Sequence, residues 1–270
     1  MPLRWFPVFL LAACLTAQAG QARQICELVM EPDHGEVLSE AGDCDSRVTP
    51  ASTFKVALAL MAFDSGALVD AHAPVLPYRP EYVDWGGDNW RQDTDPTRWM
   101  AYSVVWYSQQ IAKQLGAGTL HDYATAFEYG NGDFSGDAGK NNGLERAWIS
   151  SSLKISPREQ ARFLSRMVTG QLPVRKDAIE HTADVVATHD MPDGWVLHGK
   201  TGGAYPRHAD GSLDRNHGWG WFVGWASRGN ERVVFVRLTQ DDSRHARSPG
   251  LRTRAAFLRD FPGLMARLGL

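Results

Sequence analysis

The hydrophobic positions of this 270-residue chain predict a sheet built from its two ends and helices built from its middle. Alternating or continuous apolar runs predict strands at 24–40, 195–202, 217–226 and 231–240. Residues 52–190 read mostly as helices joined by long loops rich in glycine, aspartate and asparagine, and 251–261 read as an amphipathic helix. We therefore expect an α+β fold in which a sheet is interrupted by a mostly helical region.

Residues 1–22 have the features of a secretory signal peptide. Arg4 precedes an apolar run that is too short for a spanning helix, and small residues follow it. We expect cleavage after Ala19 or Ala22, which leaves residues 23–270 as the mature domain. The expected location is the periplasm or the cell exterior.

The three cysteines bear on anchoring and on the redox environment. Cys14 ends a Leu-Ala-Ala-Cys sequence that is similar to a bacterial lipoprotein box, so lipid anchoring there is a less favoured alternative. In an oxidising compartment Cys26 and Cys44, which flank an expected hairpin, are the natural disulfide pair. Two independent buried thiols are the alternative reading.

Composition and charge exclude several classes of function. The formal net charge of −3 argues against nucleic acid or an acidic membrane as the main partner. No apolar run after the leader is long enough to span a bilayer. The nine histidines are scattered without metal-ligand spacing, so we expect no metal site.

A helix over residues 50–63 carries the first candidate chemistry. It is apolar all round, which predicts a buried helix, and Lys55 is the only charge between Arg47 and Asp64. Burial of a lone ammonium lowers its pKa. Ser52 lies three residues earlier on the same helix face, and a hydroxyl beside a neutral amine is an activated nucleophile. A serine N-cap with a snorkelling lysine is the alternative.

A second motif and four further elements make the pattern specific. Ser52-x-x-Lys55 and Lys200-Thr201-Gly202 together resemble the serine penicillin-recognising enzymes. The remaining elements resemble class D β-lactamases, in that family's order: Ser103-Val104-Val105, Tyr129-Gly130-Asn131, Trp148 and Leu251-Arg252. The resemblance extends over residues 24–260. It implies an antiparallel sheet with flanking terminal helices, with the sheet part at about 23–51 and 192–270 and the helical part at about 52–191.

The resemblance implies hydrolysis of β-lactam antibiotics through an acyl-enzyme, and hence antibiotic resistance. Ser52 is the expected nucleophile, and Lys55, carbamylated by carbon dioxide or bicarbonate, is the expected general base. Only an unprotonated amine reacts with carbon dioxide, which suits a buried Lys55. Ser103 is expected to relay a proton to the leaving nitrogen. The indole N–H of Trp148 is the expected donor to the carbamate.

The resemblance also assigns the substrate side of the site. Seven residues are expected to bind substrate or shape its pocket: Val105, Ile149, Lys200, Thr201, Gly202, Gly203 and Arg252. The backbone N–H groups of Ser52 and Gly203 are expected to form the oxyanion hole. Lys200, Thr201 and Arg252 are expected to hold the substrate carboxylate. Val105 and Ile149 either limit water near the carbamate or simply pack in the core.

Two points stay open at this stage. A penicillin-binding sensor or peptidase that acylates without efficient turnover is the alternative function. The chain is expected to bind small β-lactams as a monomer or a homodimer, with no cofactor beyond carbon dioxide or bicarbonate.

Overall fold

A computed structural model describes residues 22–270 of the chain. Apart from residue 22, the expected signal peptide lies outside the described residues, and so does Cys14. No helix within 22–270 is long and apolar enough to cross a membrane.

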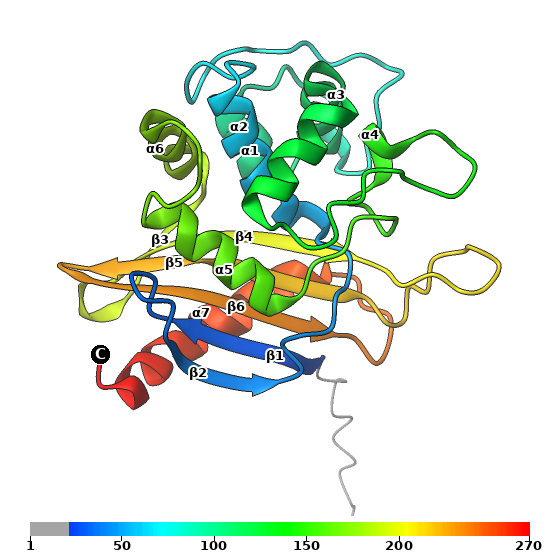
Figure 1. The fold of residues 1–270 in the computed structure, drawn as a ribbon. Coiled ribbons are helices and arrows are strands. Elements are labelled where there is room, and N and C mark those ends of the chain that lie inside the picture. Colours follow the sequence, from blue (N-terminus) through cyan, green and yellow to red (C-terminus); the bar gives the residue numbers. More distant parts are fainter. Residues whose placement is uncertain (1–21) are drawn as a thin grey trace, which may run out of the picture.

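Six antiparallel strands form one sheet in the order β2-β1-β6-β5-β4-β3 (Figure 1). Their bounds are β1 (Arg23–Met30), β2 (Val37–Gly42), β3 (Thr188–Asp190), β4 (Val196–Ala204), β5 (Trp219–Arg228) and β6 (Glu231–Gln240). The antiparallel α+β fold is thereby confirmed, and the strands expected at both ends of the chain are present. The three-residue edge strand β3 was not among the expected strands, because so short a segment has no readable alternation.

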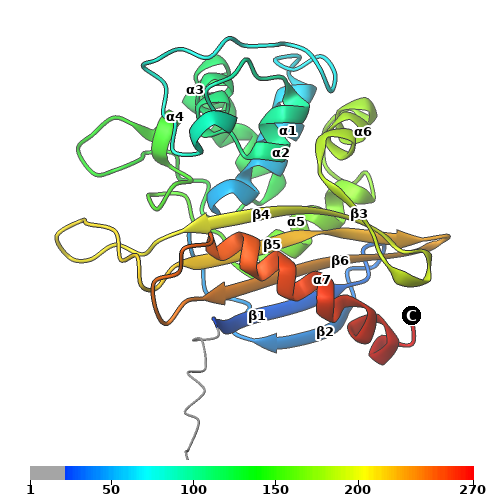
Figure 2. The same cartoon turned by 180° about the vertical axis from the view of Figure 1, so that it is seen from behind.

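Helices cover both faces of this sheet. Their bounds are α1 (Phe54–Asp64), α2 (Pro96–Tyr102), α3 (Val105–Phe127), α4 (Gly143–Arg146), α5 (Pro157–Val168), α6 (Lys176–Val185) and α7 (Pro249–Leu268), with short 3-10 turns η1 (Ala51–Thr53), η2 (Gly87–Asn89) and η3 (Pro192–Gly194). Helix α7 lies along one face, and the other helices lie on the opposite side with α5 next to the strands (Figures 1 and 2). The sheet therefore separates a large core from a smaller one under α7.

Helix α1 is the central element of the larger core. Every residue from Phe54 to Phe63 is buried, as its continuous apolar sequence predicts. Its N-terminal end follows η1 and faces β4, so the residues at this end are held between the helices and the sheet.

A disulfide joins the first hairpin to the segment that follows it. Cys26 on β1 bonds to Cys44, just beyond β2, with their Cα atoms 5.1 Å apart. Both residues are buried, and the pairing agrees with the expected disulfide rather than with two free thiols. Cross-linking a loop of this length contributes about 3 kcal/mol to stability in the chain-entropy description.

Candidate active site

Ser52 and Lys55 meet at the start of α1. Ser52 lies in η1, and the Nζ atom of Lys55 donates a hydrogen bond to its Oγ atom over 3.2 Å. The Lys55 side chain is 0% exposed. Burial lowers the pKa of Lys55 well below its usual value, and the nearby charge of Lys200 lowers it further. The alternative of a serine N-cap with a snorkelling lysine is wrong, because no side chain caps η1 or α1 and the amine does not reach solvent.

The turn that presents Ser52 is held in an uncommon backbone conformation. Ala51 has a φ of 51°, in the left-handed region that non-glycine residues rarely occupy. Thr53 Oγ1 donates to the Pro50 carbonyl over 2.7 Å, and Gln160 Nε2 of α5 donates to the same Thr53 oxygen over 2.6 Å. Such strained turns persist where surrounding contacts fix them, and they cluster at functional sites.

A second buried lysine contributes to the site from β4. The Nζ atom of Lys200 donates to Ser103 Oγ over 3.1 Å and to the Thr201 carbonyl over 3.2 Å. Lys200 is 4% exposed, and burial, aided by the charge of Arg254, lowers its pKa to about 7. Ser103 ends α2 with a φ of 56°, a second left-handed residue beside the site. The structure thus brings both predicted lysines and their two serines together.

Glycines allow three elements to converge on this point. A Cβ atom added at Gly202 would lie 2.9 Å from the Pro50 carbonyl oxygen, so only glycine lets β4 lie this close to the turn before Ser52. A Cβ atom at Gly250, at the start of α7, would lie 2.4 Å from the Gly202 carbonyl oxygen. The adjacent Gly203 is exposed, and its Cα faces the start of α7.

Trp148 lies in the loop after α4 and packs against α1. Its ring stacks obliquely on Phe54 with the ring centroids 5.3 Å apart, and the residue is only 1% exposed. Its indole N–H donates no hydrogen bond to any residue that the structure describes, so this donor is not committed elsewhere. Val105 and Ile149 both pack with the main core, which accounts for their apolar character.

The Tyr129-Gly130-Asn131 element packs against the core and binds the loop that follows Trp148. Tyr129 is a core residue between Phe54 and α5, and burial raises the pKa of its hydroxyl. The Asn131 side chain accepts from the Lys154 N–H and donates to the Ser152 carbonyl, each over 2.9 Å. Sequence comparison alone could locate this motif but could not distinguish support from catalysis.

Arg252 forms an ion pair in this structure. Its Nη2 atom lies 2.5 Å from both carboxylate oxygens of Asp241, which is 3% exposed, so the guanidinium is occupied by an ion pair beyond the end of β6. Residues two apart on a helix point in nearly opposite directions. Arg254 therefore points away from Asp241, on a side of α7 from which its charge acts on both Lys200 of β4 and His189 of β3. Its charge lowers the pKa of Lys200, and it forms no ion pair with any carboxylate within residues 22–270.

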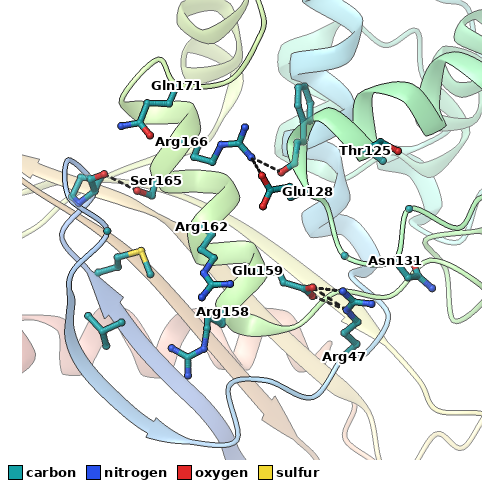
Figure 3. A pocket seen from close by; sticks show the side chains of 18 of the residues that line it. Arg47, Thr125, Glu128, Asn131, Arg158, Glu159, Arg162, Ser165, Arg166 and Gln171 are labelled. Atoms are coloured by element: carbon teal, nitrogen blue, oxygen red, sulfur yellow. Dashed lines mark hydrogen bonds and ion pairs between the residues drawn. The ribbon is translucent and has the colours of Figure 1, made fainter.

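One cavity lined by polar side chains does not coincide with these residues. A cavity of about 660 Å³ lies between the β1–β2 turn, α5 and the end of α3 (Figure 3). Arg166 there pairs with Glu128, and Arg47 pairs with Glu159. Neither Ser52 nor any of the lysines of the site lines this cavity, so we do not assign the chemistry to it.

Comparison with known proteins gives consistent matches over most of the chain. Residues 25–262 match the family described as Transpeptidase: Penicillin binding protein transpeptidase domain. The chain is 39% identical over 240 residues to Beta-lactamase OXA-9 of Klebsiella pneumoniae, covering 89% of this chain and 88% of that protein. The crystal structure of the OXA-427 class D β-lactamase matches with a TM-score of 0.84 at 46% identity, covering 90% of this chain and 99% of that chain. Regulatory protein BlaR1 of Bacillus licheniformis is 31% identical over 208 residues, 75% of this chain and 31% of that protein.

Proposed function

We propose that this chain, which belongs to the class D β-lactamases and hydrolyses β-lactam antibiotics, does so with Ser52 as nucleophile and a carbamate on Lys55 as general base. The sensor alternative is less supported, because the matches to OXA-9 and OXA-427 are more identical than the match to BlaR1 and cover most of each protein. One observation carries the proposal. The amine of Lys55 is fully buried, its pKa is strongly lowered, and it contacts the Ser52 hydroxyl.

The surroundings of Lys55 fit a carbamate. Carbon dioxide adds only to a neutral amine, forming an N–C bond and releasing one proton, and burial favours that neutral state. The anion so formed needs donors and a counter-charge. Trp148 offers an uncommitted indole N–H, and Lys200 offers a cation that the described residues otherwise leave without a carboxylate. When formed, the carbamate supplies a base that can accept the proton of Ser52 and later that of water.

The other residues of the site act on the lactam itself. Ser103 Oγ accepts a hydrogen bond from Lys200, so its own proton is free to pass to the leaving nitrogen. A lysine with a pKa of about 7 can return a proton to that serine near neutral pH. We assign the oxyanion hole to the main-chain N–H groups of Ser52 and Gly203. Losing one such donor typically raises a barrier by about 3 kcal/mol.

The carboxylate of the substrate is assigned to Lys200, Thr201 and Arg254, with Arg254 replacing the expected Arg252. Arg254 forms no ion pair with another described residue and acts electrostatically on Lys200, whereas Arg252 is held by Asp241. A free guanidinium can bind a carboxylate with two hydrogen bonds.

Arg254→Ala is expected to raise KM for a penicillin by roughly 10- to 100-fold with a smaller change in kcat, the effect of losing charge-assisted hydrogen bonds. Arg252→Ala is the matched control on the same helix. It leaves the buried Asp241 unpaired, so it is expected to lower the free energy of unfolding by about 3 kcal/mol while KM stays close to wild type. Steady-state kinetics and urea denaturation separate the two effects. A KM increase confined to Arg252→Ala would reassign the carboxylate to that residue.

The carbamate gives a specific dependence on pH and bicarbonate. As pH falls, Lys55 gains a proton and carbamate formation is opposed, so activity falls on the acidic side. Added bicarbonate is expected to restore activity there by mass action. As pH rises, Lys200 loses the charge that binds the substrate carboxylate, which produces the alkaline fall. The measurement is kcat/KM across pH in degassed buffer with and without bicarbonate. Activity that is indifferent to bicarbonate at acidic pH contradicts the carbamate.

We also propose export to the periplasm or the cell exterior. The support is the leader-like composition of the first residues and the Cys26–Cys44 disulfide, since disulfides persist mainly in oxidising compartments. Cell fractionation of the native gene product tests this location.

A further inference from the structure

The hydroxyl of Thr49 joins the Trp148 loop to the segment that carries the nucleophile. Thr49 Oγ1 donates to the Trp148 carbonyl over 2.9 Å and accepts from the Ser150 N–H over 3.1 Å. The Thr49 carbonyl is fixed in turn by the indole N–H of Trp221 over 2.9 Å. Thr49 is 7% exposed and lies three residues before Ser52. One side chain therefore fixes the main chain on both sides of residue 149.

The turn after Trp148 has a strained backbone conformation that requires stabilising contacts. Ser150 has a φ of 53°, a left-handed conformation that costs a non-glycine residue on the order of 1–3 kcal/mol. Its three polar groups are all used. The N–H binds Thr49, the carbonyl accepts from Arg207 Nε over 2.7 Å, and the hydroxyl accepts from the Tyr205 N–H over 3.3 Å. The turn is thus fixed from the nucleophile side and from the loop after β4.

We propose that Thr49 is a positioning residue that sets the orientation of Trp148, and through it the stability of the carbamate on Lys55. This inference rests on the proposed function. Thr49 touches no reacting atom in this assignment. Without its hydroxyl, the Trp148 carbonyl and the Ser150 N–H lose their partner, and the turn is free to relax. The expected loss is in the affinity of Lys55 for carbon dioxide, with the attack by Ser52 retained once the carbamate forms.

The test compares Thr49→Val with Thr49→Ser. Valine keeps the shape of threonine and removes the hydroxyl, whereas serine keeps the hydroxyl and removes only a methyl group. Thr182→Val is the matched control, because Thr182 is also buried and donates one hydrogen bond, to Ala178 within α6. The readout is the bicarbonate concentration that gives half-maximal turnover of a chromogenic cephalosporin at mildly acidic pH. The carbon-13 NMR signal of the carbamate, from labelled bicarbonate, gives a readout that needs no turnover.

Thr49→Val is expected to raise the half-maximal bicarbonate concentration about tenfold, because both hydrogen bonds of the Thr49 hydroxyl are lost, and saturating bicarbonate restores kcat. Thr49→Ser and Thr182→Val are expected to stay within about twofold of wild type. An unchanged bicarbonate requirement in Thr49→Val overturns the inference, and so does a Thr49→Ser variant as impaired as the valine. If the valine variant does not fold, Thr49→Ala is measured in its place under the same criteria. A wild-type enzyme indifferent to bicarbonate is a different result, since it removes the carbamate itself.

Discussion

Lys55→Met is expected to lower kcat/KM for a penicillin by about a thousandfold, within the range that a positioned general base contributes. The fold is expected to survive. The Lys55 side chain is fully buried without a carboxylate partner among the described residues, so an apolar side chain of similar length removes a desolvation cost and breaks no ion pair. Stopped-flow acylation kinetics measure the loss, and thermal denaturation measures the stability.

Lys154→Met is the control for this variant, because it makes the same substitution at an exposed side chain. It should leave both activity and stability close to wild type. A Lys55→Met enzyme that keeps more than a tenth of the wild-type kcat/KM would show that Ser52 is activated in another way. A variant that unfolds would instead show that the amine has a structural partner.

Trp148→Phe is expected to slow deacylation by about 100-fold and acylation by much less, as removal of one charge-assisted hydrogen bond to the carbamate predicts. Phenylalanine retains the ring contact with Phe54 but has no N–H group. Because acylation then outpaces hydrolysis of the acyl-enzyme, the variant should give a burst of product followed by slow turnover. Rapid-quench or stopped-flow measurements with a chromogenic cephalosporin resolve the two phases.

Trp195→Phe provides the same substitution in the smaller core, where Trp195 packs against Phe261 of α7. It should change stability and leave the ratio of the two rates unaltered. Equal loss of acylation and deacylation in Trp148→Phe contradicts a role on the carbamate. A burst in Trp195→Phe would indicate that any weakened core produces the effect.

The two lysines could be predicted from the sequence because their surroundings along the chain are informative. Lys55 stands alone in a continuous apolar helix, so burial followed directly, and burial alone suffices to lower its pKa. Lys200 was identified from the Lys200-Thr201-Gly202 motif, and in the structure the glycine of that motif allows close approach of another element. The structure shows that this element is the turn before Ser52.

The choice between Arg252 and Arg254 could not be made from sequence. Arg252 and Arg254 both lie in the first turns of α7. Which of the two side chains points toward the site depends on how the helix is rotated about its axis against the sheet. The Leu251-Arg252 element indicated Arg252, which pairs with Asp241 in the structure. Asp241 lies in the loop directly after β6, where the sequence has no regular pattern of apolar residues. The ion pair could therefore not be predicted from the sequence.

Thr49 and Ser150 were missed for a different reason. Their contacts depend on a left-handed turn at Ser150, and that conformation is rare for serine and has no sequence signature of its own. A threonine in a loop is read as ordinary polar surface until its partners are known.

The pairing of β1 with β6 constrains when this protein can fold. Met30 stands opposite Val234, and β1 has no other partner on that side. A ribosome therefore releases the first strand long before it makes the strand that completes the sheet, so a half-synthesised chain cannot close its core. Such non-local pairing gives slow folding, on the scale of milliseconds to seconds. The delay would keep the nascent polypeptide unfolded for longer, which is the state that the proposed export through a membrane requires.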